Sequence, residues 1–137
     1  MKPTTILLII LLGLNAISQT NTETKMKIIE VKDVETKQTP HNVDVRVLYD
    51  KESAQAVHIE LKPGESLKPH ITPVDVFFYV LEGTPSIMVG EETIEVKKDQ
   101  LIESPKDIKH CIYNYSKETA RILVIKAPKP TSSARIL

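Results

Sequence analysis

Apolar and polar residues alternate along most of the chain beyond residue 27. The alternation is cleanest at residues 43–47 (VDVRV) and 57–61 (VHIEL). A period of two is typical of β-strands with one buried face, and no stretch sustains the 3.6-residue period of an amphipathic helix. The pattern therefore predicts an all-β chain with nine short strands, at residues 27–31, 43–47, 57–61, 74–81, 86–89, 93–96, 101–103, 108–113 and 121–125.

Turn-forming residues separate these strands. Gly64, Gly83 and Gly90 all lie between strands, and we expect them to have positive φ angles, which glycine adopts at low cost. Nine short strands at this spacing predict a sandwich or barrel, which we place at residues 27–127. A flexible lead-in at 19–26 precedes it. The tail at 128–137 is expected to be an extended surface segment, because its prolines cannot continue a strand.

The first 18 residues have the features of a secretory signal peptide. Lys2 supplies a positive start, residues 6–14 form an apolar run, and Ala16 and Ser18 are the small residues of a cleavage site. The run is well short of the ~20 residues that span a membrane. We expect cleavage after Ser18, no membrane span after that removal, and a periplasmic or secreted protein. An uncleaved anchor or a buried N-terminal helix is the alternative.

Composition narrows the possible functions. The 137 residues leave room for one domain, and 18 basic against 18 acidic residues give zero net charge. This balance argues against a nucleic acid partner, which would need a basic surface. The single cysteine, Cys111, excludes an internal disulfide and a Cys-rich zinc module. Its simplest role is that of a small packed residue.

Two segments resemble the metal-binding motifs of the cupin family. The first family motif is G-x5-H-x-H-x3-E-x6-G. Residues 64–83 match it at Gly64, His70 and Gly83, but Thr72 stands in place of the second histidine and Val76 in place of the glutamate.

The second family motif is G-x5-P-x-G-x2-H-x3-N. Residues 99–114 match it at Pro105, His110 and Asn114, while Asp99 and Asp107 replace the glycines. Aspartate tolerates the left-handed conformation, so these turns can persist. The resemblance implies a single-domain, cupin type-2-like barrel, that is, a double-stranded β-helix or jelly roll, with a degenerate first metal motif.

The resemblance also implies where a metal would bind. A divalent transition metal prefers imidazoles and a carboxylate that converge from rigid strands. Only His70 and His110 occupy ligand positions here, so a metal would be held loosely, with water or with Asp75 or Glu103 completing its shell. Asp75 has the wrong strand parity to face the lumen. A pair of histidines that are hydrogen-bonded across the barrel, without metal, is the alternative.

The remaining candidate side chains receive simpler assignments. We expect a largely apolar lumen. His58 is expected to face solvent, His41 to lie in a surface loop, and Phe77 to pack in the core. The predicted lumen contains the two candidate ligands and the pocket residues Thr72, Val76, Phe78 and Ile112.

These features predict an exported protein that binds a small molecule in its barrel, around a weakly held divalent metal. One alternative is a metal-dependent enzyme of the dioxygenase, isomerase or decarboxylase type, as cupins often are. The other is a metal-free interaction module that forms a homodimer through residues 43–49. Because a fold does not determine a function, the sequence leaves enzymatic activity open.

Overall fold

The structure, a computed structural model, describes residues 1, 3, 13 and 24–137. Most of the predicted signal peptide and most of the lead-in therefore lie outside the described residues. Ten strands form in the described part: β1 (Asp44–Lys51), β2 (Ala54–Leu61), β3 (His70–Ile71), β4 (Asp75–Glu82), β5 (Ser86–Val89), β6 (Glu92–Glu95), β7 (Leu101–Ser104), β8 (Lys109–Tyr113), β9 (Ala120–Ala127) and β10 (Arg135–Ile136).

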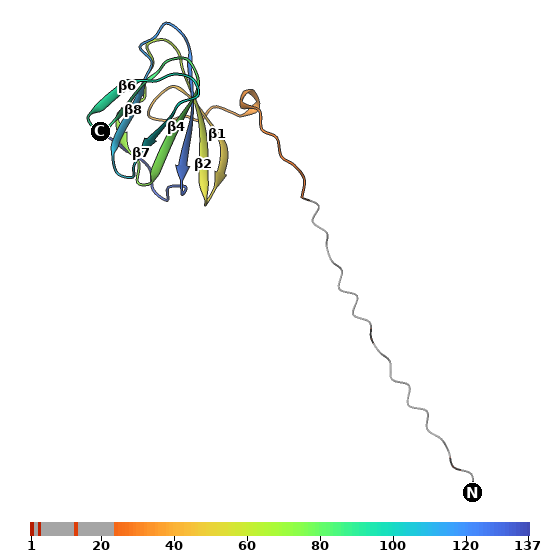
Figure 1. Ribbon diagram of the computed structural model, residues 1–137. Coiled ribbons are helices and arrows are strands. Elements are labelled where there is room, and N and C mark those ends of the chain that lie inside the picture. The colour runs from red at the N-terminus through yellow and green to blue at the C-terminus, as the bar shows by residue number, and fades with distance from the viewer. Residues whose placement is uncertain (2, 4–12, 14–23) are drawn as a thin grey trace.

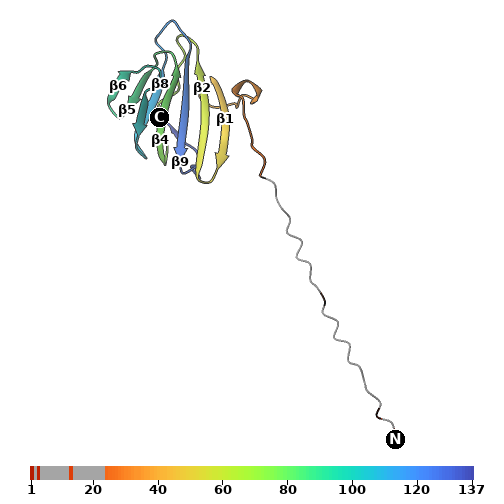
Figure 2. The same ribbon diagram turned by 45° about the vertical axis from the view of Figure 1, so that its right-hand side comes forward.

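The strands build two antiparallel five-stranded sheets that face each other as the walls of a barrel (Figures 1 and 2). The sheet of long strands has the order β1-β2-β9-β4-β7, and the second sheet has the order β10-β3-β8-β5-β6. Sequence-distant strands are neighbours in both, as in a jelly roll. The all-β jelly-roll fold predicted from the sequence is confirmed.

Alternating apolar residues of both sheets meet in one core. Phe78, Val80 and Ile122 of the long sheet and Ile87 of the second sheet are almost fully buried. Burial of apolar area at roughly 25 cal/mol per Å² is the main force that holds the sheets together. Phe78, rather than Phe77, is the buried residue of its pair; Phe77 has the opposite strand parity and is half-buried on the outer face.

The strand predicted at residues 27–31 is wrong. Residues 24–43 form no strand, Val31–Asp33 form a single 3-10 turn, and the backbone N–H of Lys37 donates to the carbonyl oxygen of Val45 in β1 at 2.7 Å. The guanidinium of Arg46 donates hydrogen bonds to the carbonyl oxygens of Val31 (3.1 Å) and Val34 (2.9 Å). A side chain thus satisfies the backbone groups that a neighbouring strand would otherwise have paired.

The C-terminal tail is more ordered than predicted. Within it, β10 pairs with β3, and the backbone N–H of Leu137 donates to the carbonyl oxygen of Pro69 at 3.0 Å. Both strands have only two residues, too few to produce a readable alternation. The tail therefore forms part of the barrel wall as well as surface.

The two aspartates that replace motif glycines adopt the predicted left-handed backbone. Asp99 has a φ of 66° and Asp107 a φ of 62°. The backbone N–H of Asp107 donates to the carbonyl oxygen of Thr72 at 3.0 Å, so this turn is tied to the strand region of the first motif. The three glycines between strands have positive φ, also as predicted.

Asn114, the last match of the second motif, has a structural role. Its side-chain amide donates to the carbonyl oxygens of Leu61 (2.9 Å) and Glu118 (2.8 Å), and it is almost completely buried. These bonds hold the β8–β9 turn against the end of β2. The match of Asn114 to the motif is thus explained by its role in the fold and is no evidence for a functional site.

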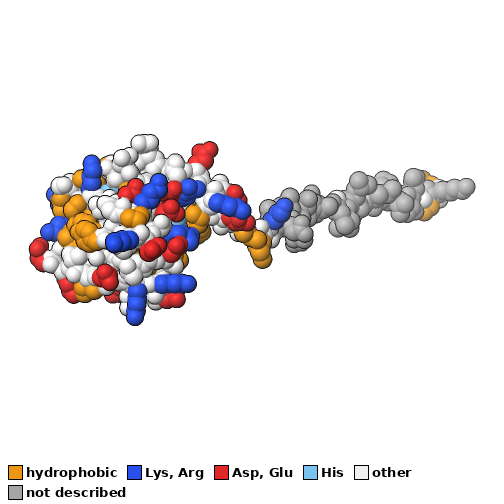
Figure 3. All heavy atoms as spheres, turned by 90° about the horizontal axis from the view of Figure 1, so that it is seen from above, with side chains coloured by type: hydrophobic (Ala, Val, Ile, Leu, Met, Phe, Trp, Pro, Cys, Tyr) orange, Lys and Arg blue, Asp and Glu red, His pale blue; other side chains and the backbone are white. Residues whose placement is uncertain are grey.

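The outer surface is mixed in charge. In Figure 3, acidic and basic side chains are interspersed over the face shown, with small apolar areas between them. Among residues 1, 3, 13 and 24–137, no helix is long and apolar enough to cross a membrane.

Candidate functional site

A cavity of about 600 Å³ lies between the sheets, at one end of the barrel. Its walls are strand residues of both sheets, most of them from the long sheet, and two loop segments, 37–41 and 130–134, complete its rim. The apolar part of the wall includes Val57, Ile59 and Val124. Of the predicted pocket residues, Thr72, Val76 and Phe78 line the cavity.

Ile112 does not line the cavity, contrary to the sequence-based prediction. It shares a strand face with His110, but it lies two residues further along β8, where it pairs with Ile87 and is fully buried. Strand parity identified the correct face. It could not give the depth along the strand at which the sheets close on each other.

The structure brings His70 and His110 together. They are direct cross-strand partners in β3 and β8, and their Nε2 atoms lie 3.0 Å apart. The rings meet nearly at right angles, with centroids 4.5 Å apart, and Phe78 packs edge-on against His110. Only 8% of His70 and 2% of His110 is exposed.

A chain of hydrogen bonds fixes which nitrogen of each ring carries the proton. The Nδ1 of His70 lies 2.8 Å from the carbonyl oxygen of Lys68, which can only accept, so Nδ1 carries the proton. The neutral ring then presents a lone pair on Nε2. His110 donates its Nε2–H to that lone pair, and its Nδ1 accepts the hydroxyl proton of Ser104 at 2.6 Å.

Thr72 completes the polar end of the cavity, and Ser104 supports it from outside the lining through its hydrogen bond to His110. The Oγ1 of Thr72 lies 3.2 Å from the Nε2 of His110. Ser104, which is 1% exposed, was not predicted as a site residue. It ends β7 directly opposite Val76, and only this pairing across sequence-distant strands reveals its position.

Burial keeps the histidines of the cavity neutral. It lowers the pKa of His110 to about 3, with a smaller contribution from the charge that His70 would carry. Burial likewise lowers the pKa of His70. Both rings are therefore unprotonated at neutral pH, and able to accept a proton or to bind a metal, and His110 remains so well below neutral pH.

Two histidines assigned to solvent lie elsewhere. His41 lines the cavity: its Nδ1 accepts the backbone N–H of Lys68 at 3.0 Å, and its ring centroid lies 4.8 Å from that of His70. His58 is 1% exposed on the outer face of β2, where its Nε2 accepts a hydrogen bond from Arg121 at 3.1 Å. Neighbouring arginine side chains cover it, which a strand pattern cannot foresee.

The remaining candidate ligands stay outside the cavity. Asp75 is exposed, and its carboxylate accepts the backbone N–H of Lys106 at 2.8 Å. Glu103 is also exposed, and Cys111 is buried behind the sheet, with its Sγ 3.1 Å from the carbonyl oxygen of Leu67. Cys111 is thus the packed residue that its position beside His110 predicted.

The ligand set for a resident metal is therefore incomplete in the described part of the chain. There, no group of three or more His, Cys, Asp or Glu residues could hold an ion. Two nitrogen ligands about 2.1 Å from one ion lie about 3.0 Å apart at right angles and about 3.4 Å apart in a tetrahedral site. The spacing of His70 and His110 matches the right-angle value. The pair suits loose binding in which water or a ligand supplies most of the shell.

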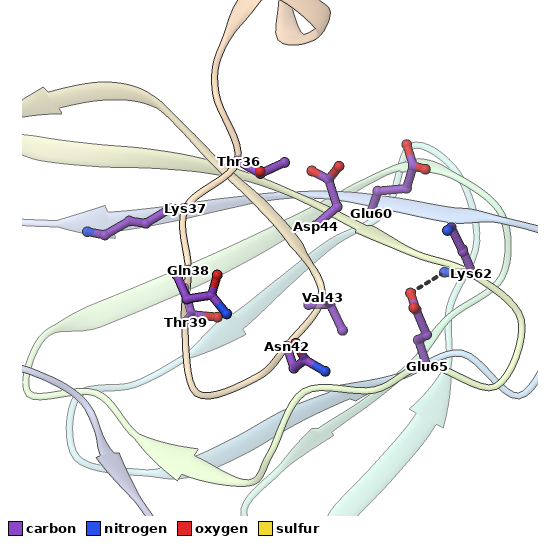
Figure 4. A pocket seen from close by; sticks show the side chains of 10 residues that line it. All are labelled: Thr36, Lys37, Gln38, Thr39, Asn42, Val43, Asp44, Glu60, Lys62 and Glu65. Atoms are coloured by element: carbon purple, nitrogen blue, oxygen red, sulfur yellow. Dashed lines mark hydrogen bonds between the residues drawn. The ribbon is translucent and has the colours of Figure 1, made fainter.

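A second, polar hollow of about 320 Å³ lies between the segment 36–43 and the ends of β1 and β2 (Figure 4). Two of its three carboxylates, those of Asp44 and Glu65, already have partners in the fold. Asp44 pairs with Arg46 at 2.9 Å, and Glu65 accepts the backbone N–H of Lys62 at 2.8 Å. The histidine-containing cavity is the stronger candidate site.

Comparison with known proteins places the fold in a family. The family model described as a cupin domain matches residues 57–126, half of the chain. The tetracenomycin polyketide synthase protein TcmJ of Streptomyces glaucescens is 32% identical over 72 residues, which are 52% of this chain and 48% of TcmJ. The chain thus spans about half the length of that relative. The polyketide synthase CurC of Streptomyces cyaneus is 29% identical over 114 residues, 77% of this chain and 73% of CurC.

Solved structures of other proteins show the same fold. The polyketide cyclase RemF from Streptomyces resistomycificus superposes with a TM-score of 0.71 at 23% identity, over 82% of this chain and 86% of RemF. The protein TT1209 from Thermus thermophilus gives a TM-score of 0.67 at 27% identity, over 77% of this chain and all of that one. With both motif windows in the expected strands and turns, the chain belongs to the cupin family.

Proposed function

We propose that this protein binds a small, mainly apolar organic molecule in the cavity, with an oxygen function of that molecule at the His70–His110 pair. The observation that carries the proposal is the cavity itself, an apolar-walled space of about 600 Å³ that ends in buried, neutral, hydrogen-bonded histidines. Ligand sites combine apolar walls with a few convergent polar groups in this way.

The relatives suggest the chemical class of the ligand. Two of them are named polyketide synthase proteins, and a structural neighbour is named a polyketide cyclase, which points to a ligand that contains rings. A planar ring system would pack against Val57, Val124 and Phe78, all of which line the cavity. A carbonyl or hydroxyl group at one end would then exchange hydrogen bonds with the histidine pair.

Titration with 1,8-dihydroxyanthraquinone, followed by its visible absorbance, tests this proposal. We expect saturable binding of one dye per chain. Ala134→Trp at the rim of the cavity should weaken binding by about tenfold or more, because the indole fills the entrance. Lys117→Trp, in the exposed β8–β9 turn at the other end of the barrel, is the control of equal size. Dye binding that ignores Ala134→Trp would place the ligand elsewhere.

A metal-assisted version of this function is the second candidate. It is supported by the 3.0 Å spacing of the Nε2 atoms of His70 and His110. When bound, a divalent metal would polarise an oxygen of the ligand as a Lewis acid. Elemental analysis of protein purified from its natural compartment, and calorimetric titration with Zn²⁺, Ni²⁺ and Mn²⁺, test this. We expect weak binding that His70→Ala removes.

We further propose that the protein acts outside the cytoplasm. The support is the sequence of the first 18 residues, with Ala16 and Ser18 after the apolar run. The intact mass of the exported protein should correspond to a chain that starts at Gln19. A mature product that retains Met1 in the membrane fraction would contradict export with cleavage.

A further inference from the structure

The proposed binding cavity has cationic side chains in its wall and no carboxylate in its described lining. Lys37 and Lys126 line it together with three histidines, and none of the described lining residues is an aspartate or glutamate. Lys126 lies on β9 two residues beyond Val124, so both side chains share the inner face of the strand. In register, Lys126 stands between Gln55 of β2 and Val76 of β4, which also line the cavity.

Neither lysine forms an ion pair in the described part of the chain, and the carboxylate that interacts with the charge of Lys37 is that of Asp50. Figure 4 shows the side chain of Lys37 pointing away from Asp44 and Glu60. Asp50, whose carboxylate accepts a hydrogen bond from Gln55, already pairs with Lys129 at 2.8 Å.

A half-buried ammonium group without a partner is costly, because it loses hydration and gains no opposite charge. The surroundings of Lys126 are consistent with this cost. Burial lowers the pKa of its ammonium group, and the nearby charge of Lys37 lowers it further. An anion in the cavity would supply the opposite charge that the ammonium group of Lys126 lacks. A small neutral ligand would leave that group without an opposite charge.

We propose that the ligand is an organic anion, with its apolar body against Val57, Val124 and Phe78 and a carboxylate at Lys126. This inference rests on the proposed function and adds that the ligand carries a negative charge. Lys126 binds the carboxylate directly, and Lys37 at the rim attracts it from solution. The histidine pair then contacts the part of the ligand that lies deeper in the cavity.

Calorimetric titration with two probes of equal shape, 2-naphthoate and 2-naphthamide, tests the inference. At neutral pH only the first is charged. We expect naphthoate to bind wild-type protein about tenfold more tightly or better, since a hydrogen bond to a charged group is worth about 1.5–3 kcal/mol. Lys126→Met should remove this preference by weakening naphthoate alone. Lys126→Arg should retain it.

Lys98→Met is the matched control, because it removes the same charge from an exposed turn outside the cavity. It should leave the preference unchanged, and circular dichroism should show that all variants fold. Equal affinities for the two probes in wild-type protein, or an unchanged preference in Lys126→Met, would overturn the inference while naphthamide binding upheld the proposed function. If neither probe bound to folded wild-type protein, both proposals would fail.

Discussion

The Oγ of Ser104 and the Nδ1 of His110 lie 2.6 Å apart, on either side of the turn that joins β7 to β8. Because the hydroxyl proton points at Nδ1, the Nε2 of His110 carries the ring proton. His70, which donates from Nδ1 to the Lys68 carbonyl, has the opposite arrangement. The two rings are therefore opposite tautomers.

This assignment can be measured by NMR. Long-range proton–nitrogen spectra of the metal-free protein at neutral pH should show His110 protonated at Nε2 and His70 protonated at Nδ1, because only this combination satisfies every partner. Two rings with the same tautomer would show that no Nε2–H···Nε2 hydrogen bond joins His70 and His110.

Ser104→Ala should lower the free energy of unfolding by about 1–3 kcal/mol, because it leaves the buried Nδ1 of His110 without a partner. Urea unfolding with a fluorescence or circular dichroism readout measures the effect. Ser53→Ala, in the exposed β1–β2 turn, should change stability by no more than about 0.5 kcal/mol. Equal small effects would show that Ser104 is not the donor on which His110 depends.

Two glycines with similar backbone angles should respond differently to alanine. Gly83 has a φ of +79°, and an added Cβ would lie 2.5 Å from the carbonyl oxygen of Thr119. Gly64 has a φ of +83°, and an added Cβ would meet nothing within 4 Å. We expect Gly64→Ala to cost about 1–2 kcal/mol, from backbone strain alone. Gly83→Ala should cost clearly more, because backbone must move; similar melting temperatures would contradict this.

Stability should fall as the pH falls below neutral. The pKa of His110 is lowered from 6.5 to about 3 in the folded state, so between these values the unfolded chain binds more protons and gains stability relative to the folded one. The contribution of His110 is present above pH 6.5. About 2 kcal/mol of it should be lost between about pH 7.5 and 5.

His41, with a pKa of about 4, shifts stability in the same direction. The test compares urea unfolding of the parent and of His110→Asn over this pH range, which stays above the ordinary titration of carboxylates. The variant should show the shallower pH dependence. An identical slope in both proteins would mean that His110 is not buried as a neutral ring.

Restoring the two missing ligands of the family motif should create a strong metal site. Thr72→His with Val76→Glu places a third imidazole and a carboxylate beside His70 and His110. Thermal melts with Zn²⁺, Ni²⁺ or Mn²⁺ should show a large rise for this variant, since binding to the native state alone adds about 2.7 kcal/mol at a hundredfold excess over Kd. The parent should show a small rise or none.

In the metal-free double variant, the new carboxylate at position 76 has a cationic neighbour, which the sequence alone could not identify. Lys126 stands directly opposite position 76 on β9. We therefore expect the metal-free variant to lose less stability than an unpaired buried carboxylate would cost, which is several kcal/mol. Adding Lys126→Met to the double variant should expose that cost. If it does not, Lys126 does not reach position 76.

The sequence predicted the elements whose signals are local. The alternation at 57–61, the turns at Asp99 and Asp107 and the alignment of His70 with His110 depend on spacing along the chain, and the structure shows each of them. The position of the pocket followed from strand parity, as Val76 and Phe78 show.

The features missed are those that arise when distant segments meet. Ser104 reaches His110, Arg121 covers His58, and His41 turns into the cavity, only because the sheets bring remote parts of the chain together. The strand expected at 27–31 failed for the same reason, because Arg46 supplies hydrogen bonds from elsewhere in the fold.

The rim of the cavity combines the segments 37–41 and 130–134, which lie nearly at opposite ends of the described chain. During synthesis the core strands β2 and β4 leave the ribosome long before β9 and β10 exist to pair with them. Closing such distant contacts is slow, since the entropy of the intervening chain is lost first. The wall of the cavity should therefore be complete only after β10 has docked beside His70.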